Sequence, residues 1–119
     1  MPVVADRARI EQVLANLLDN AMKYTDRGRV IVRTGVRDGM SWCEVEDTGA
    51  GIPEEHQPRV FERFYRVDKA RSREQGGTGL GLSIVKHIVE LHDGTVSLRS
   101  APGQGSTFRF EIPTHPLGA

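Results

Sequence analysis

Four glycines fall within six residues of the stretch GGTGLGLS, residues 76–83, directly before a run with apolar residues at helical spacing. A glycine-rich turn that leads into a helix often holds phosphate, because backbone N–H groups and the helix dipole favour an anion there. Two common phosphate motifs do not fit. Leu82 stands where a Walker loop needs lysine, and the glycines alternate instead of following the dinucleotide fingerprint. A flexible hinge before a buried helix is an equally good interpretation of the glycines alone.

Polar side chains follow one side of an upstream predicted helix in the stretch NLLDNAMKY, residues 16–24. Asn16, Asn20 and Lys23 are spaced four and three residues apart, so they lie along the edge of its apolar stripe. Asparagines hydrogen-bonded to nearby backbone would explain this pattern. Alternatively, an Asn oxygen ligates Mg²⁺ while Lys23 meets phosphate. A single neutral oxygen is a poor site for free Mg²⁺, so the metal would arrive bound to a nucleotide.

The stretch DTGAGI, residues 47–52, comes directly after a predicted strand. Its glycines allow a sharp turn and let a flat ligand approach the backbone. The Asp47 carboxylate could accept a hydrogen bond from the adenine 6-amino group, whereas guanine carries a carbonyl at that position. Taken alone, an ordinary D-x-G turn explains the motif better.

The segment Tyr65–Gly77 is charged and nearly free of apolar residues, which predicts a mobile loop. A solvated charged loop accounts for most of these residues, but its cations also suit phosphate oxygens: Arg66, Lys69, Arg71 and Arg73.

Hydrophobic periodicity and turn residues predict the elements that position these stretches. We expect helices over Arg7–Tyr24 and Leu80–His92, with a short helix within Pro53–Phe64. Leu91 belongs to the wide apolar arc of the second long helix, which we expect to be well buried. The order helix, hairpin, helix, hairpin predicts helices packed on one face of a mostly antiparallel sheet. The expected strands are Arg29–Val36, Met40–Asp47, Thr95–Ser100 and Ser106–Pro113.

Composition sets broad limits on the chain. Its 119 residues predict a single domain over residues 1–119, with 38% hydrophobic and 27% charged residues. Sixteen basic residues balance sixteen acidic ones, so no global field draws the chain to nucleic acid or to anionic lipid. No transmembrane or signal segment is expected. Cys43 lies in an alternating run, where a small buried strand residue is a better interpretation than a nucleophile.

Five stretches in order resemble the catalytic ATP-binding domain of sensor histidine kinases, within the GHKL ATPase superfamily. They are NLLDNAMKY (the N box), DTGAGI (the G1 box), FERFYR (the F box), GTGLGL (the G2 box) and the closing GQGSTFRFEIP, and they span about residues 6–113. The resemblance implies an α+β fold, a two-layer α/β sandwich with a mixed, mostly antiparallel sheet and about three helices on one face. It also implies ATP and Mg²⁺ as ligands, held between the two long helices under a mobile lid.

The resemblance assigns roles residue by residue. Asn20 would bind Mg²⁺, whereas Asn16, Lys23 and Arg66 would lie near the phosphates and act in catalysis. Asp47 would read adenine, and Phe61 with Phe64 would anchor the lid. The remaining residues expected at ATP are Tyr24, Gly49, Gly51, Ile52, Gly77, Thr78, Gly79, Leu80, Gly81, Leu82 and Thr107.

Two features depart from a whole sensor kinase. None of His56, His87, His92 or His115 stands in the context of a phosphoacceptor histidine, which belongs to an upstream helical-hairpin domain. The usual first strand is also absent. The chain therefore looks like a fragment, a cytoplasmic catalytic module of a parent kinase anchored in the bacterial inner membrane, with its own phosphoacceptor domain and a response regulator as partners.

Three rival functions stay open within the superfamily. Hydrolytic relatives carry a glutamate base one turn before the metal-binding asparagine, and anti-sigma serine kinases resemble them there. This chain has Asn16 at that position, and a neutral amide cannot take the proton of water. A nucleotide-sensing module without catalysis is the third alternative. Histidine phosphorylation is the preferred hypothesis.

Overall fold

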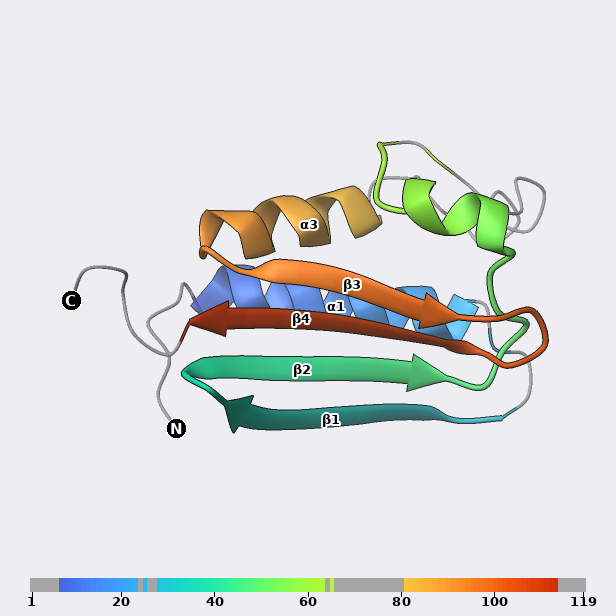
Figure 1. The fold of residues 1–119 in the computed structure, drawn as a ribbon, viewed down its shortest axis with the longest axis horizontal. Helices are drawn as coiled ribbons and strands as arrows, with labels where there is room; N and C mark the ends of the chain where they lie inside the picture. Colours follow the sequence, from blue (N-terminus) through green and yellow to red (C-terminus); the bar gives the residue numbers. More distant parts are fainter. Residues whose placement is uncertain (1–6, 24, 26–27, 64, 66–80, 114–119) are drawn as a thin grey trace.

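The computed structural model describes residues 7–23, 25, 28–63, 65 and 81–113. Four antiparallel strands form one sheet in the order β1-β2-β4-β3, and the long helices α1 and α3 cover one face of it (Figure 1). This arrangement confirms the predicted two-layer α+β sandwich, and the described strand pairs are antiparallel throughout. The elements are α1 (Arg7–Lys23), β1 (Val30–Arg37), β2 (Met40–Asp47), η1 (Glu54–Arg59), α3 (Gly81–Leu91), β3 (Thr95–Ser100) and β4 (Ser106–Pro113).

The long elements lie where hydrophobic periodicity places them, within a residue or two at each end. The β1–β2 hairpin turns at Asp38 and Gly39, both with positive φ, as the twist-matched two-residue turn requires. The short helix η1 is a 3-10 helix containing Pro58, whose ring and missing N–H do not suit a regular α-helix interior.

The core lies between the sheet and the two long helices. Side chains from α1 and α3 meet the inward-facing residues of β2 and β4. Leu91 does not belong to it: its side chain is 57% exposed, which corrects the expectation that the whole apolar arc of α3 is buried. Leu91 is the last residue of α3 and lies beyond its buried residues Val85, Ile88 and Val89. The buried hydrophobic residues are Val13, Leu17, Ala21, Cys43, Val45, Val60, Val85, Ile88, Val89, Phe108, Phe110 and Ile112.

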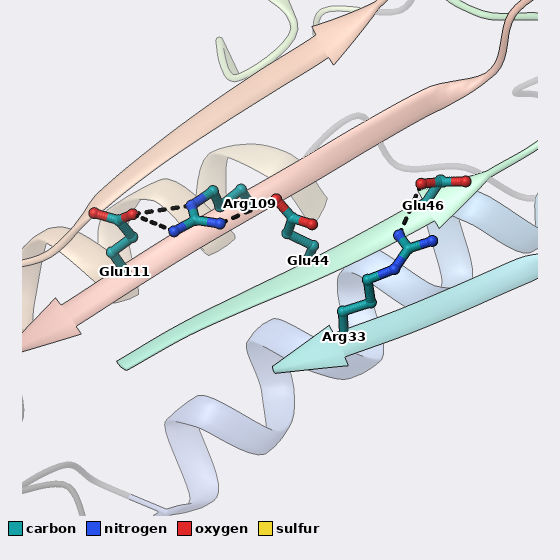
Figure 2. Close-up of polar contacts among 5 residues, drawn as sticks. All are labelled: Arg33, Glu44, Glu46, Arg109 and Glu111. Atoms are coloured by element: carbon teal, nitrogen blue, oxygen red, sulfur yellow. Dashed lines mark hydrogen bonds and ion pairs between the residues drawn. The ribbon is translucent and has the colours of Figure 1, made fainter. Parts of the chain in front are cut away.

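The opposite face of the sheet carries charged side chains arranged across neighbouring strands (Figure 2). Arg33 of β1 pairs with Glu46 of β2 at 2.8 Å. Arg109 of β4 bonds both Glu44 at 3.0 Å and Glu111 at 2.6 Å. The Arg109 guanidinium also lies 4.6 Å from the centroid of the Trp42 ring. The cross-strand pairs Arg33–Glu46 and Arg109–Glu44 stabilise this face of the sheet.

No helix in the described part of the chain is long and apolar enough to cross a membrane. The segment Tyr65–Gly77, which we expect to be a mobile loop, lies outside the described residues except for Tyr65.

Candidate functional site

A buried carboxyl group marks the C-terminal end of β2. Asp47 is 4% exposed and lies on the helix-facing side of the sheet, two residues after Val45 of the core. Its Oδ1 accepts a hydrogen bond from the Gly49 N–H at 2.9 Å. Burial raises the pKa of the Asp47 carboxyl, and hydrogen bonds from the Gly49 and Ser106 backbone offset part of that shift. A carboxyl group held here at a cost in solvation is typical of a functional site.

Thr25, just beyond the end of α1, is the second polar group at this place. Its hydroxyl lies near enough to lower the pKa of Asp47, yet the two groups do not reach regular hydrogen-bond geometry. The Thr25 Oγ1 is buried and has no hydrogen-bond partner among the described residues. Such an atom is costly unless a ligand or water satisfies it. Thr25 and Asp47 therefore offer a donor and an acceptor to a bound polar molecule. The sequence contains no signal that singles out Thr25.

The loop after Asp47 packs closely against the turn between β3 and β4. Gly51 has a φ of 76°, and a Cβ there would lie 2.0 Å from the Ala101 carbonyl oxygen. Gly105 faces β2 in the same way, since its Cβ would lie 2.0 Å from the Asp47 carbonyl oxygen. The Gly103 N–H also bonds the Ala50 carbonyl at 2.7 Å. These contacts require glycine and fix the loop beside Asp47.

The polar side of α1 lies near the beginning of α3. The Asn16 amide Nδ2 donates to the Gly81 carbonyl at 3.3 Å, so it joins the two helices directly. Lys23 pairs with Asp19 at 3.1 Å, and Asn20, between Asn16 and Lys23, is half-buried. Among the described residues, a Cβ added at Gly81 would meet no atom within 4 Å. The structure thus brings together Asn16 and Gly81, two of the residues that the resemblance assigns to ATP between the long helices.

The strand register shows where the expected site residue Thr107 lies relative to Asp47. Thr107 pairs with Glu46, whereas Ser106 pairs with Asp47. Side chains alternate along a strand, so Thr107 shares the outer face with Arg109, and Ser106 shares the inner face with Asp47. Ser106 is the β4 residue beside the buried carboxyl, and Thr107 is not. The alternation of Phe108, Phe110 and Ile112 with charged residues already indicates the inner face of β4, whereas the pairing of Ser106 with Asp47 is set by the register.

The other expected residues divide into two groups. Phe61 packs edge-on against Phe108 of the core with ring centroids 5.9 Å apart, and Leu82 and Ile52 also pack on the core. The second group lies outside the described residues: Tyr24, Phe64, Arg66, Gly77, Thr78, Gly79 and Leu80.

Comparison with known families decides the identity of this arrangement. The family described as histidine kinase-, DNA gyrase B-, and HSP90-like ATPase matches residues 5–116. The chain belongs to this family. Within it, the chain is a histidine kinase catalytic ATP-binding domain of the GHKL superfamily, because its similar relatives and structures are histidine kinases.

The kinase domain is 53% identical over 110 residues to the sensor histidine kinase YkoH of Bacillus subtilis, covering 92% of this chain and 24% of that protein. It is 49% identical over 115 residues to the sensor-like histidine kinase SenX3 of Mycolicibacterium smegmatis, covering 96% of this chain and 30% of that protein. The kinase domain therefore spans about a quarter to a third of the length of these curated relatives.

Two solved structures share its fold. The mycobacterial sensor histidine kinase MprB superposes with a TM-score of 0.83 at 35% identity, covering 97% of the kinase domain and 78% of the MprB chain. Full-length ShkA in complex with AMPPNP also gives a TM-score of 0.83 at 35% identity, covering 100% of the kinase domain and 24% of the ShkA chain.

Proposed function

We propose that this kinase domain binds Mg-ATP and transfers the γ-phosphoryl group to a histidine on a separate phosphoacceptor domain of its own sensor kinase. The observation that carries the proposal is the buried pair of Asp47 and Thr25, one with a carboxyl of raised pKa and one with a hydroxyl lacking a regular partner. Family membership and the likeness to a structure holding AMPPNP support a nucleotide as the occupant.

Asp47 is the proposed adenine-reading group. The Gly49 N–H donates a hydrogen bond to the Asp47 Oδ1. A carboxylate has about four lone-pair sites, so it can also accept a hydrogen bond from the adenine 6-amino group. Guanine would place a carbonyl oxygen against the carboxylate and leave both groups unsatisfied, so it would be rejected. Thr25 has a hydroxyl that can donate to a ring nitrogen of the same base.

The proposed phosphate end lies between α1 and α3. The first turn of α3 presents backbone N–H groups, which suit phosphate oxygens. Lys23, in the last turn of α1, has a salt bridge to Asp19 at 3.1 Å. Its ammonium group is the proposed point charge for a phosphate oxygen at this end.

Asn20 is the proposed ligand for Mg²⁺, through its amide oxygen. Its half-buried position on α1, between Asn16 and Lys23, fits a metal that takes most of its ligands from phosphates and water. The ion would neutralise phosphate charge when bound.

Catalysis in this proposal consists of positioning and charge neutralisation, since phosphoryl transfer asks for little covalent help from the protein. Asn16 and Lys23 would hold the phosphates in line with the incoming imidazole, and Arg66 is the proposed further cation. The histidine nitrogen attacks phosphorus, the bond to the ADP oxygen breaks, and the phosphoryl group moves to the imidazole.

Asn16 is the residue that separates this proposal from hydrolysis. Its amide donates to the Gly81 carbonyl, and an ionised glutamate could not make that bond. The position is thus used as a donor and not as a base for water. A GHKL hydrolase, an anti-sigma-type serine kinase or a nucleotide-sensing module remain the alternatives for the experiment to test.

The experiment is incubation of the chain with γ-labelled ATP, with and without the helical-hairpin domain of its own kinase. We expect nucleotide binding but no labelling of the chain alone, slow hydrolysis, and acid-sensitive labelling on histidine when the partner is added. Rapid turnover by the chain alone would support the hydrolase, and acid-stable label on serine would support the anti-sigma type. Binding without labelling of the added partner would support a sensing module.

The proposal extends to the parent protein. A kinase domain of this type would lie on the cytoplasmic side of a parent anchored in the bacterial inner membrane. Its phosphohistidine would pass the phosphoryl group to a response regulator in two-component signal transduction.

A further inference from the structure

The Ser100 hydroxyl, at the end of β3, lies at the centre of a small polar network. It accepts from the Ile52 N–H at 2.9 Å and donates to the Gly105 carbonyl at 2.8 Å. The Ser106 hydroxyl lies 2.9 Å from it. A hydroxyl has one donor hydrogen and two acceptor lone pairs, so Ser106 must donate and the Ser100 hydroxyl is then fully satisfied.

The Gln57 amide, on η1, closes the same network from the other side. Its Nε2 donates to the Ile52 carbonyl at 2.9 Å and to the Ser100 carbonyl at 3.0 Å. Both amide hydrogens are therefore used. As a result, the Ile52 N–H is held by Ser100, 48 residues further along the chain, and the Ile52 C=O is held by Gln57, five residues further along.

We propose that Ser100 and Gln57 are positioning residues that fix the slot for the adenine base, by clamping Ile52 at the far end of the loop that begins at Asp47. This inference rests on the proposed adenine-binding role of Asp47.

The two ends of the loop are held in different ways. Asp47 itself is held by strand pairing to Ser106, so the near end of the loop belongs to the ladder. The far end, at Ile52, lies outside every strand and is held by the Ser100 and Gln57 side chains. Releasing Ile52 would let the loop widen while β3 and β4 keep their backbone pairing.

The first test is Ser100→Ala, with Ser97→Ala as a matched control. Ser97 is on the same strand with an exposed side chain. We expect Ser100→Ala to weaken ADP binding roughly three- to tenfold, the loss of about one hydrogen bond, and Ser97→Ala to change it less than about twofold. The ratio of GDP to ADP dissociation constants should fall in parallel. Ser100→Thr keeps the hydroxyl and should restore both values.

The second test is Gln57→Glu, with Gln57→Met as a neutral variant of similar length. The glutamate places a carboxylate oxygen against the carbonyls of Ile52 and Ser100, so we expect a larger loss of ADP affinity than with methionine. In the transfer reaction with the phosphoacceptor domain, both variants should raise the KM for ATP and leave kcat within about twofold. Gln57 lies on the surface helix η1, so these variants remain informative if Ser100→Ala does not fold.

The outcomes separate the two levels of the argument. One outcome is that the wild type binds ADP tightly and that Ser100→Ala and Gln57→Glu leave ADP affinity and selectivity unchanged. This outcome would overturn the proposed clamp and leave the proposed function standing. A kcat that falls as KM stays constant would also overturn it. A wild-type chain that binds ADP and GDP equally would overturn the adenine role of Asp47, and the clamp with it.

Discussion

The Asp47 carboxyl is held in the fold at a cost in stability. It is buried among core residues at the end of β2, and its raised pKa means that the folded state disfavours the charged form. The same property leaves an acceptor that is poorly solvated and ready for a ligand. A residue kept under these conditions is a candidate for recognition and not for folding.

The first prediction is that Asp47→Asn stabilises the chain while it removes adenine selectivity. A carboxyl whose pKa is raised on folding contributes no penalty below its unfolded pKa and destabilises the fold as pH rises through the folded pKa. The free energy of unfolding of Asp47→Asn should therefore exceed that of the wild type at pH 7, and the difference should shrink as the pH is lowered toward about 4. Urea unfolding at several pH values measures this, with the exposed Glu90→Gln as control. A variant less stable than the wild type at pH 7 would contradict the prediction.

The second prediction concerns Cys43. Burial raises the pKa of its thiol to about 11, with the neighbouring Glu44 charge adding to the shift. Because the thiolate is the reactive form, the folded chain should react with iodoacetamide at pH 8 far more slowly than the chain in urea. Equal rates in the two conditions would show that Cys43 is accessible and not a core residue.

Helix α3 illustrates how an element can carry a function at one end and packing along its length. Val85, Ile88 and Val89 are buried, whereas a Cβ added at Gly81, the first position, would meet no atom of the described residues within 4 Å. Glycine in a helix is less favourable than alanine by about 1 kcal/mol. No packing contact with the described residues requires glycine at Gly81, which fits the proposed approach of phosphate to the backbone there. Gly35 of β1 is the opposite case, since a Cβ there would lie 2.6 Å from the Trp42 ring.

The third prediction compares alanine at these two glycines. Gly81→Ala should keep or raise the melting temperature and weaken ATP binding. Gly35→Ala should lower stability by about 1–3 kcal/mol through overpacking, with ATP affinity unchanged in the folded fraction. Thermal unfolding and ATP titration of both variants provide the measurement. Wild-type ATP affinity in Gly81→Ala would remove this end of α3 from the phosphate site.

At the scale of the whole molecule, the candidate site lies where the helical layer and the sheet meet. Asp47 belongs to β2, Asn16 to α1 and Gly81 to α3, and the direct Asn16–Gly81 bond holds the two helices together at this place. The Asp47 loop is braced in turn by β3, β4 and η1. A ligand that contacts all of these elements should stabilise the entire fold.

The fourth prediction follows from this linkage. Mg-ADP at 100 times its dissociation constant should stabilise the chain by about 2.7 kcal/mol, because it binds the folded state and not the unfolded one. The melting temperature should rise with ADP concentration and much less with GDP. Scanning calorimetry over a concentration series tests the relation. A melting temperature that does not respond to millimolar ADP would contradict nucleotide binding by the chain.

Local pattern alone determined the elements of this protein, and the resemblance to a known family indicated its broad function. Apolar residues at helical spacing placed α1 and α3, alternation placed the strands, and Asp38 with Gly39 marked the hairpin, because each signal depends on neighbours within a few residues. The ordered boxes were sufficient to indicate a kinase domain of this family, which the comparisons confirm.

Only the tertiary structure decided which side chains surround Asp47. Ser106 lies beside it because the β2–β4 register pairs these two residues, and that register depends on how two distant strands align. Thr25 reaches the carboxyl only once α1 docks on the sheet. Gln57 and Ser100 meet across 43 residues of sequence, and no local periodicity encodes that contact. These pairings are set by the packing of one layer on another, and they become visible only when the layers are assembled.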